Sequence, residues 1–471
     1  MRKTKIICTM GPASEKPVTI EKMIKSGMDI ARLNFSHGNH EEHRERINII
    51  QKVSNKLSKN IGIMQDLQGP KIRIGKFKPG IQNIILQPGE KYILTTENCP
   101  EGDKNKVNVD YKELHRYLTK NDRIFLDDGK IELLVKKVIN RNIECEVVVG
   151  GELSERKGLS LPDKHLPQPV ITQQDINDLY FGMKIGVNYV AVSFTRKKEN
   201  ILKIRKLLRN NNKISLIAKI EDAEGLSNIN SIIDVSDGIM IARGDLGVCL
   251  PRAEVPLIQK EIIRKCRKSG KPVIVATQML DSMTTNLHPT RAEVNDVANG
   301  VLDGADCLML SGETSIGKYP IETVREMGEI INTIEKSADY LKTLTSENFY
   351  PQERGLIQGL SIAIDKLSQV DNAKAIICLT KTGNTAKIIS QYRPQLPIIA
   401  VTVDKTIAMK LLVYWGIKVL IGKKVKDVER NYNTFVRQVK REGLVNESGI
   451  VIITSGIKEK PFLANISVVE V

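Results

Sequence analysis

Short, mainly apolar runs alternate with amphipathic stretches along residues 1–69 and 167–343. Runs of this length and composition are typical of strands buried on both faces, which pair in parallel. Eight strands are predicted: Lys5–Met10, Asp29–Phe35, Ile61–Asp66, Tyr189–Phe194, Ser215–Ile220, Gly238–Ala242, Pro272–Thr277 and Cys307–Leu310. Amphipathic stretches between most of them, such as His40–Lys59, predict helices. The pattern therefore predicts an α/β fold, a closed (βα)8 barrel of the TIM type.

Residues 70–166 interrupt this rhythm with short segments of alternating apolar and polar residues. Glycine-containing pairs at Pro79-Gly80, Pro88-Gly89 and Asp128-Gly129 separate the segments and predict tight turns. We expect an inserted small all-β barrel after the third barrel strand. An insertion at the end of a barrel strand lies on the face where such barrels place their active sites, so it is positioned to act as a lid.

The last part of the chain, residues 344–471, has the pattern of a separate C-terminal α/β domain. Its predicted strands are Ala375–Leu379, Pro397–Val401, Val419–Ile421, Gly449–Ile453 and Ile466–Val469. The chain is thus predicted to have a discontinuous catalytic barrel (1–69 and 167–343), a lid (70–166) and a C-terminal domain (344–471).

Composition excludes several classes of protein. With 41% hydrophobic and 27% charged residues, the chain of 471 residues has the composition of a folded globular protein. No apolar run is long enough to span a bilayer, and the short run after the basic start is read as a strand, not a signal peptide. The seven cysteines show no C-x-x-C pair, which predicts reduced thiols and a cytoplasmic location.

The net charge of +16 raises the question of nucleic-acid binding. However, the positive charge is spread over all parts of the chain, with its largest excess, +7, in residues 344–471. Aromatic residues make up only 4% of the chain, too few for a surface on which bases stack. We therefore expect no nucleic-acid partner, and small phosphorylated ligands fit the modest excess better.

The sequence Ala218-Lys219-Ile220-Glu221-Asp222 contains the strongest candidate chemistry. Lys219 and Glu221 are two residues apart on a predicted strand, so their side chains share one face. Asp245 follows the next strand, within a Gly244-Asp245-x-Gly247 loop that allows close approach of a ligand. Two carboxylates suit Mg²⁺, and an ammonium suits a transferring phosphoryl group. A solvated ion pair at a strand end is the alternative.

A second candidate cluster follows the predicted strand Asp29–Phe35. Arg32, Asn34 and Ser36 alternate with apolar residues and so point the same way, as a corner for a phosphate and a cation would require. An ordinary loop with a capping serine is the alternative. Thr277, at the end of another strand, is a candidate for passing a proton through water, or else a buried structural residue.

In the C-terminal domain, a hydroxyl-rich turn joins a predicted strand to a helix. Hydroxyls, a glycine and a helix N-terminus together form a cradle for phosphate. The residues concerned are Thr380, Lys381, Thr382, Gly383, Asn384 and Thr385. Such turns are common, so the pattern alone is weakly specific.

Eight blocks of the sequence resemble the signature motifs of the pyruvate kinase family, and in particular its bacterial branch. They occur in order and together with the insertion and the third domain cover essentially the whole chain. They are Thr4–Ser14, Ala31–Gly38, Asp66–Arg73, Ala218–Gly225, Ser236–Gly247, Ala276–Met283, Pro289–Val294 and Met309–Thr314.

The resemblance implies transfer of a phosphoryl group from phosphoenolpyruvate to ADP, giving pyruvate and ATP in the last step of glycolysis. It implies that Lys219 stabilises the moving phosphoryl group and that Glu221 and Asp245 hold Mg²⁺. The other implied roles are phosphate contacts at Arg32 and Arg73, the substrate pocket at Gly244 and Thr277, nucleotide contacts at Asn34, His37 and Lys157, and a monovalent-cation site at Asn34, Ser36, Asp66 and the Leu67 carbonyl. The family also implies a homotetramer with an allosteric effector at 380–385.

Two departures from the family pattern lead to further expectations. Lys71 stands where potassium-dependent members carry glutamate, so we expect K⁺ not to be required. The segment Thr454–Pro461 lacks the glycine-rich loop that clamps a bisphosphate, so we expect a sugar monophosphate or a nucleotide to be the effector. A carbon–carbon lyase of the phosphoenolpyruvate/pyruvate barrel group and a phosphate-sensing binding protein remain as alternatives.

Overall fold

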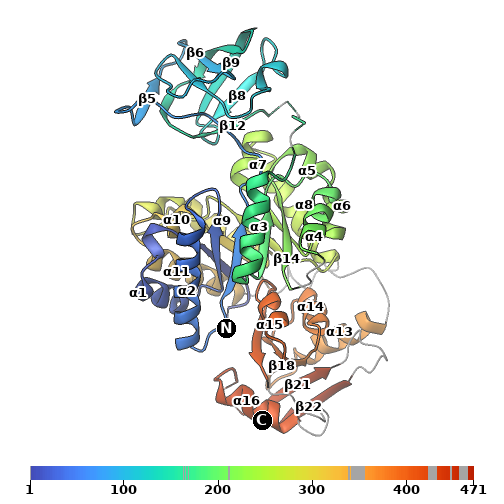
Figure 1. The fold of residues 1–471 in the computed structure, drawn as a ribbon. Helices are drawn as coiled ribbons and strands as arrows, with labels where there is room; N and C mark the ends of the chain where they lie inside the picture. Colours follow the sequence, from blue (N-terminus) through green and yellow to red (C-terminus); the bar gives the residue numbers. More distant parts are fainter. Residues whose placement is uncertain are drawn as a thin grey trace.

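A computed structural model describes residues 2–470, except 163, 165, 168, 210–212, 338–339, 341–355, 423–431, 446–447 and 456–464. The lid, the barrel and the C-terminal domain follow one another along the molecule, with the barrel in the middle (Figure 1). The predicted fold class is confirmed. The domain boundaries stay predictions, and the boundary at 343/344 lies outside the described residues. Residues 456–461 of the segment Thr454–Pro461, which is predicted to lack a bisphosphate-binding loop, also lie outside them.

The central domain is a closed barrel of eight strands in the order β1-β17-β16-β15-β14-β13-β3-β2, all paired in parallel. The strands are β1 (Lys5–Thr9), β2 (Ile30–Asn34), β3 (Gly62–Asp66), β13 (Tyr189–Val192), β14 (Ser215–Ile220), β15 (Gly238–Ala242), β16 (Val273–Ala276) and β17 (Cys307–Leu310). Each agrees with a predicted strand to within two residues at either end.

Helices surround the barrel, and most of them pack apolar side chains on it (Figure 1). They are α1 (Pro17–Ser26), α2 (His40–Lys56), α3 (Gln173–Ile185), α4 (Lys198–Leu207), α5 (Ala223–Ser227), α6 (Ile229–Val235), α7 (Arg243–Cys249), α8 (Val255–Lys268), α9 (Arg291–Leu302), α10 (Gly312–Ser315) and α11 (Pro320–Glu335). Side-chain caps fix several of their starts; the Thr290 hydroxyl, for example, accepts a hydrogen bond from Glu293 N at 3.3 Å.

The lid is built from β-strands that pair mostly antiparallel, while β6 and β7 pair in parallel. A seven-stranded sheet has the order β4-β12-β8-β9-β10-β6-β7, and β5 and β11 form a separate pair. The strands are β4 (Ile72–Arg73), β5 (Asn83–Leu86), β6 (Lys91–Thr95), β7 (Lys106–Asn108), β8 (Arg123–Leu126), β9 (Ile131–Ile139), β10 (Asn142–Val149), β11 (Gly151–Ser154) and β12 (Gly158–Ser160). A bridge between Ile74 and Val109 links the two edges, so the sheet curls nearly into a barrel.

The C-terminal domain is a five-stranded sheet flanked by helices, in the order β20-β19-β18-β21-β22. Only the pairing of β22 with β21 is antiparallel among the described strands. The elements are α13 (Leu356–Leu367), β18 (Ala373–Leu379), α14 (Asn384–Gln391), β19 (Ile398–Thr402), α15 (Lys405–Leu411), β20 (Ile417–Ile421), α16 (Tyr432–Arg441), β21 (Ile450–Ser455) and β22 (Asn465–Glu470). No described helix is both long and apolar enough to cross a membrane.

The C-terminal domain closes the amino-terminal end of the barrel. Apolar residues inside the barrel, such as Ile7 and Met240, form one buried cluster with residues of the C-terminal domain, such as Leu411. Buried polar contacts fix the junction: the Tyr189 hydroxyl donates to the Met409 carbonyl at 2.5 Å. The lid lies at the opposite end of the barrel (Figure 1). A pocket lies there, at the carboxyl ends of the barrel strands.

Asp306 is the polar centre of this junction, and its replacement by alanine is expected to lower stability. Its Oδ1 pairs with Arg393 at 3.0 Å and accepts from Trp415 N at 3.1 Å, while Oδ2 accepts from Val273 N at 3.0 Å. Asp306→Ala leaves a buried guanidinium without its carboxylate, which costs about 3–5 kcal/mol in comparable pairs. The free energy of unfolding in urea measures this loss.

The matched control is Glu41→Ala, because Glu41 pairs with Arg44 on the exposed face of α2. Exposed pairs contribute about 1 kcal/mol or less. Equal losses in the two variants would contradict a structural role of the Asp306–Arg393 pair.

Candidate active site

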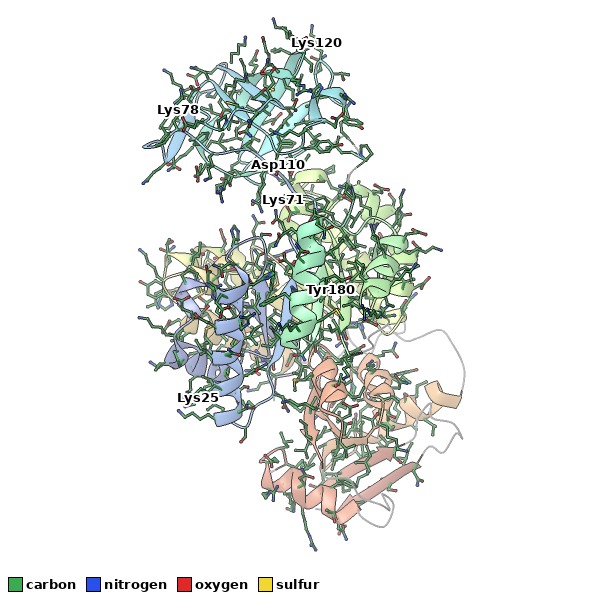
Figure 2. The ribbon with its side chains drawn as sticks, in the orientation of Figure 1. Lys25, Lys71, Lys78, Asp110, Lys120 and Tyr180 are labelled. Carbon is green, nitrogen blue, oxygen red and sulfur yellow. The ribbon has the colours of Figure 1, made fainter. Side chains whose placement is uncertain are left out.

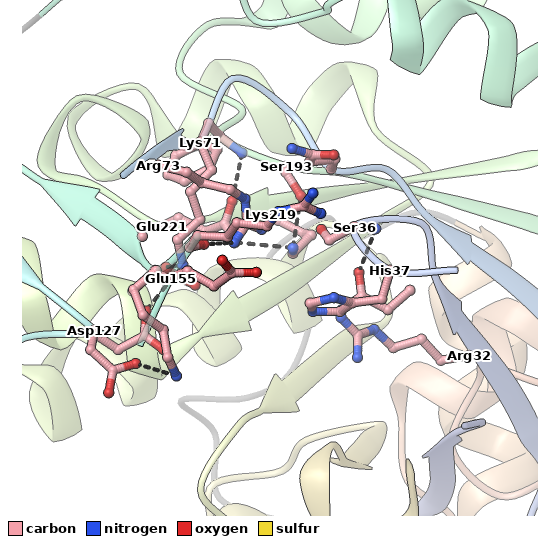
Figure 3. Close-up of a pocket in the computed structure, with 18 residues that line it drawn as sticks. Arg32, Ser36, His37, Lys71, Arg73, Asp127, Glu155, Ser193, Lys219 and Glu221 are labelled. Carbon is pink, nitrogen blue, oxygen red and sulfur yellow. Dashed lines mark hydrogen bonds and ion pairs between the residues drawn. The ribbon is translucent and has the colours of Figure 1, made fainter. Parts of the chain in front are cut away.

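A cavity of about 600 Å³ lies between the carboxyl ends of the barrel strands and the lid (Figure 3). The parallel arrangement brings the carboxyl ends of all eight strands to one rim of the barrel. Polar residues at these ends therefore share the cavity. The lining residues are Arg32, Asn34, Ser36, His37, Gln68, Lys71, Arg73, Asp127, Asp128, Glu155, Arg156, Lys157, Gly158, Ser193, Phe194, Lys219, Glu221 and Asp245.

Beneath this lining, Asp66 at the end of β3 organises the charges. Its carboxylate accepts from Arg32 Nε at 2.7 Å and pairs with Lys219 Nζ at 3.2 Å, and its side chain is 1% exposed. Burial alone would raise the pKa of Asp66, but the charges of Lys219 and Arg32 outweigh it and lower the pKa below its usual range. Asp66 is therefore an anion that fixes two cations at the floor of the cavity.

Lys219 and Glu221 share one face of β14, as their spacing predicts. Lys219 Nζ lies 3.0 Å from Glu221 Oε1 and donates to Ser193 Oγ at 2.8 Å (Figure 3). Burial lowers the pKa of Lys219, but the carboxylates of Asp66 and Glu221 outweigh it, so the net shift is upward. Lys219 therefore stays an ammonium at neutral pH.

Glu221 is held by the backbone and faces a second carboxylate. Its Oε2 accepts from Phe194 N at 2.6 Å. Burial raises the pKa of Glu221 above its usual range, the ammonium of Lys219 lowers it in part, and the carboxylate of Asp245 raises it further. Two carboxylates close enough to repel each other, with hard oxygen atoms only, fit a Mg²⁺ ion that takes its other ligands from substrate and water. Among the described residues, no three histidine, cysteine or acidic side chains cluster as a ready-made metal site.

Lys71 lies where the lid meets the barrel (Figure 2). Its ammonium is 2.8 Å from Asp245 Oδ1 and 3.1 Å from Asp128 Oδ1 of the lid. Burial lowers the pKa of Lys71, but these two carboxylates outweigh it and raise the pKa above its usual range. Lys71 thus brings a permanent positive charge into the cavity and links the two domains.

The remaining predicted contact residues lie around the mouth of the cavity. Asn34 Oδ1 accepts from Ser36 N at 3.1 Å, and Lys157 pairs with Asp127 at 2.8 Å. Arg73 donates to the Arg156 carbonyl at 3.1 Å. Burial and the positive charges nearby, that of Arg73 first, lower the pKa of His37, so His37 is neutral at pH 7.

Four of the predicted residues lie outside the lining of this cavity. Asp66 and the Leu67 carbonyl lie beneath it; the carbonyl accepts from Ser193 Oγ at 2.7 Å. Gly244 and Thr277 lie beside Asp245, where Gly244 N donates to Thr277 Oγ1 at 2.8 Å.

Several lining residues were missed by the sequence analysis. Ser193 directly follows β13, and a polar residue at a strand end is a signal that could have identified it. Asp128 was predicted only as part of the turn Asp128-Gly129, and its neighbour Asp127 was not singled out, because no local signal indicates that this turn faces the barrel. Glu155 and Arg156 belong to the lid and reach the cavity only because of how the lid folds.

In the C-terminal domain, the hydroxyl-rich turn joins β18 to α14 as predicted. The Thr380 hydroxyl accepts from Gly383 N at 2.8 Å, and Gly383 has a φ of 84°, which favours glycine. Asn384 N donates to Thr382 Oγ1 at 3.4 Å. Thr382 is exposed, whereas Thr385 is buried.

Comparisons with known proteins identify the family. The family model "Pyruvate kinase, barrel domain" matches residues 1–324, and "Pyruvate kinase, alpha/beta domain" matches residues 360–469. The chain belongs to the pyruvate kinase family. It is therefore a phosphotransferase, as the motifs predict, and the lyase alternative is not favoured.

Similar proteins named pyruvate kinase come from staphylococci. The chain is 44% identical over 461 residues to that of Staphylococcus haemolyticus (strain JCSC1435) and 43% identical over 461 residues to that of Staphylococcus epidermidis (strain ATCC 12228 / FDA PCI 1200). It is 44% identical over 460 residues to that of Staphylococcus aureus (strain COL). Each alignment covers 97% of this chain and 78% of the relative.

Proposed function

We propose that this cavity binds phosphoenolpyruvate and ADP and transfers the phosphoryl group between them, giving pyruvate and ATP. The observation that carries the proposal is the position of the Lys219 ammonium, which lies 3.0 Å from the Glu221 carboxylate at the floor of an open cavity. The carboxylate of Asp245 lies near that of Glu221. A cation next to a pair of carboxylates is the arrangement that phosphoryl transfer needs, because the transferring group carries negative charge.

Two arginines are suited to hold the phosphate of phosphoenolpyruvate. Arg32 donates hydrogen bonds from Nε to the Asp66 carboxylate and from Nη1 to the Thr9 hydroxyl. Among the contacts of the described residues, this leaves Nη2 available for a phosphate oxygen. Arg73 approaches from the lid side of the cavity (Figure 3). Because Arg32 is already fixed by Asp66, it loses little conformational freedom on binding.

Glu221 and Asp245 would hold Mg²⁺. When bound, the ion would neutralise part of the negative charge of the substrates. The chain's own part is to present two carboxylates at fixed positions, with Glu221 anchored by Phe194 N.

Lys219 would stabilise the phosphoryl group while the bond to the enolate oxygen breaks and the bond to the ADP oxygen forms. The enolate then takes a proton at its methylene carbon and becomes pyruvate. We assign this proton transfer to a water molecule held by Thr277, with the backbone of Gly244 beside it. Asn34, His37 and Lys157 would contact the nucleotide, His37 as a neutral hydrogen-bonding group.

Asn34, Ser36, Asp66 and the Leu67 carbonyl would form the monovalent-cation site, and we propose that its occupation by K⁺ is optional. Lys71 supplies positive charge nearby: its side chain is 20% exposed and paired with Asp245, so it does not point into solvent. The proposed enzyme is a homotetramer, as the family resemblance implies, and it lies in the cytoplasm, as its scattered cysteines predict.

The function and the metal site are tested together by a coupled assay that follows pyruvate formation from phosphoenolpyruvate. Pyruvate is expected only when both ADP and Mg²⁺ are present. Glu221→Gln should raise the Mg²⁺ concentration for half-maximal activity at least tenfold, because an anionic ligand is lost. Lys219→Met should lower kcat by at least about 100-fold with a smaller change in KM, because its charge acts mainly in the transition state.

The control for these variants is Lys203→Met on the exposed side of α4, which should keep normal kinetics. Formation of pyruvate without ADP would contradict a kinase and indicate a phosphatase, which transfers the phosphoryl group to water. Near-normal turnover of Lys219→Met would contradict its assigned role.

Activity is expected not to depend on potassium. Initial rates in potassium chloride and in tetramethylammonium chloride, at equal ionic strength, should agree within threefold. Lys71→Glu should create a dependence on K⁺, since it reverses the charge beside Asp245 and Asp128. A loss of more than tenfold without K⁺ in the unmodified enzyme, about 1.4 kcal/mol of barrier, would contradict the prediction.

Regulation by a phosphorylated effector is expected at Thr380–Thr385. A hexose monophosphate or a nucleoside monophosphate should activate more strongly than fructose 1,6-bisphosphate at equal concentration. Thr382→Glu should abolish this response, because it places a negative charge in the phosphate cradle. Dose–response curves measure both effects, with Thr333→Glu on the exposed face of α11 as the control. A response that survives Thr382→Glu would exclude this site.

A further inference from the structure

The turn that carries Thr277 has an unusual backbone. Thr277 and Gln278 follow one another with φ values of 71° and 54°, in the left-handed region. This region is rare for residues other than glycine, and for a β-branched residue such as threonine it is strained. Such a conformation persists only where the surrounding structure holds it, and it is often found where position matters for function.

One arginine holds this turn. Arg243, the first residue of α7, donates from Nη2 to the Thr277 carbonyl at 2.8 Å and to the Gln278 carbonyl at 3.2 Å. The same nitrogen lies 2.9 Å from Met279 Sδ. A single guanidinium therefore contacts three successive residues of the strained turn.

Asp296 on α9 orients this guanidinium. Its two oxygens accept from Nη1 and Nη2 of Arg243 at 2.6 and 2.7 Å, a two-point contact that fixes the plane of the group. The side chain of Arg243 is only 12% exposed. Its position is thus set by α9 on one side and by the turn on the other.

The hydroxyl of Thr277 is held in place by the residues next to this turn. Oγ1 accepts from Gly244 N, the residue after Arg243, and donates to the Ala276 carbonyl at 2.6 Å. A Cβ on Gly244 would stand 3.3 Å from Oγ1, so the hydroxyl is placed tightly against the loop that also carries Asp245. Arg243 therefore connects the backbone of Thr277 to the proposed metal-binding loop.

We propose that Arg243 and Asp296 are positioning residues, which keep Thr277 in the left-handed conformation that sets its hydroxyl against Gly244 N, beside the loop that carries Asp245. The inference rests on the proton-transfer role proposed for Thr277. Without the guanidinium, the turn relaxes, and the water that passes the proton to the enolate carbon loses its support. Binding of phosphoenolpyruvate depends on Arg32 and Arg73 and is not affected.

The experiment measures proton transfer separately from phosphoryl transfer. In deuterium oxide with Mg²⁺ and ATP present, the enzyme removes a proton from the methyl group of pyruvate to give the enolate, and a deuteron from solvent replaces it. NMR of the methyl group gives the exchange rate. Arg243→Met is expected to lower this rate roughly 100-fold, the scale of acid–base catalysis, with KM for phosphoenolpyruvate within threefold of normal. Asp296→Asn should cause a smaller loss of the same kind.

A double-variant comparison shows whether Arg243 acts through Thr277. Thr277→Val removes the hydroxyl and should lower exchange strongly. Adding Arg243→Met to Thr277→Val should then change exchange less than threefold, because residues that act as one unit are not additive. A second full loss in the double variant would overturn the proposal, as would normal exchange in Arg243→Met.

Two further measurements separate this proposal from its alternatives. If Thr277→Val exchanges normally, the proton-transfer role of Thr277 fails, and the positioning role fails with it. Arg205→Met is the matched control: Arg205 also contacts both a carboxylate (Asp237) and a main-chain carbonyl (Val235), each at 3.0 Å, away from the turn. Urea unfolding is measured for every variant. An equal loss of exchange in Arg205→Met and Arg243→Met would show a general structural effect and overturn the proposal.

Discussion

The carboxylate of Asp66, buried under the floor of the cavity, is the interaction on which the site depends. It binds Arg32 and Lys219 at the same time. Without it these two buried cations would repel each other, with the carboxylate of Glu221 left to balance both charges. Asp66 can do this because β3 lies beside β2 in a closed parallel barrel, with Asn34 paired to Asp66 in the register. The order of the strands in the closed barrel therefore determines that Asp66 contacts Arg32 and Lys219.

The two ends of the barrel have opposite environments. At the amino-terminal end, apolar side chains from inside the barrel merge with those of the C-terminal domain, and Asp306 ties Arg393 and Trp415 into the junction. At the carboxyl end, Lys71 joins Asp245 of the barrel to Asp128 of the lid. One end is therefore a buried interface between domains, and the other is an open polar cavity.

Strained backbone is found on both sides of that cavity. Asp127 and Asp128 of the lid have φ values of 49° and 54°, and Thr277 and Gln278 of the barrel are also left-handed. Each pair is held by charged side chains: Lys157 and Lys71 bind the aspartates, and Arg243 binds the threonine turn. The contacts of these charged side chains therefore hold the strained backbone and, at the same time, position groups around the cavity.

The sequence by itself determined the eight barrel strands, the inserted lid, the C-terminal domain and the family, because apolar periodicity and local motifs record these features directly. It also determined that Lys219 and Glu221 share a face, since that follows from the two-residue repeat of a strand. Only the tertiary structure decided that Lys71 pairs with Asp245, 174 residues away, and that Asp127 and Glu155 enter the cavity. Any lysine can pair with any carboxylate, so partners across domains depend on where the lid folds against the barrel, which no local pattern of residues encodes.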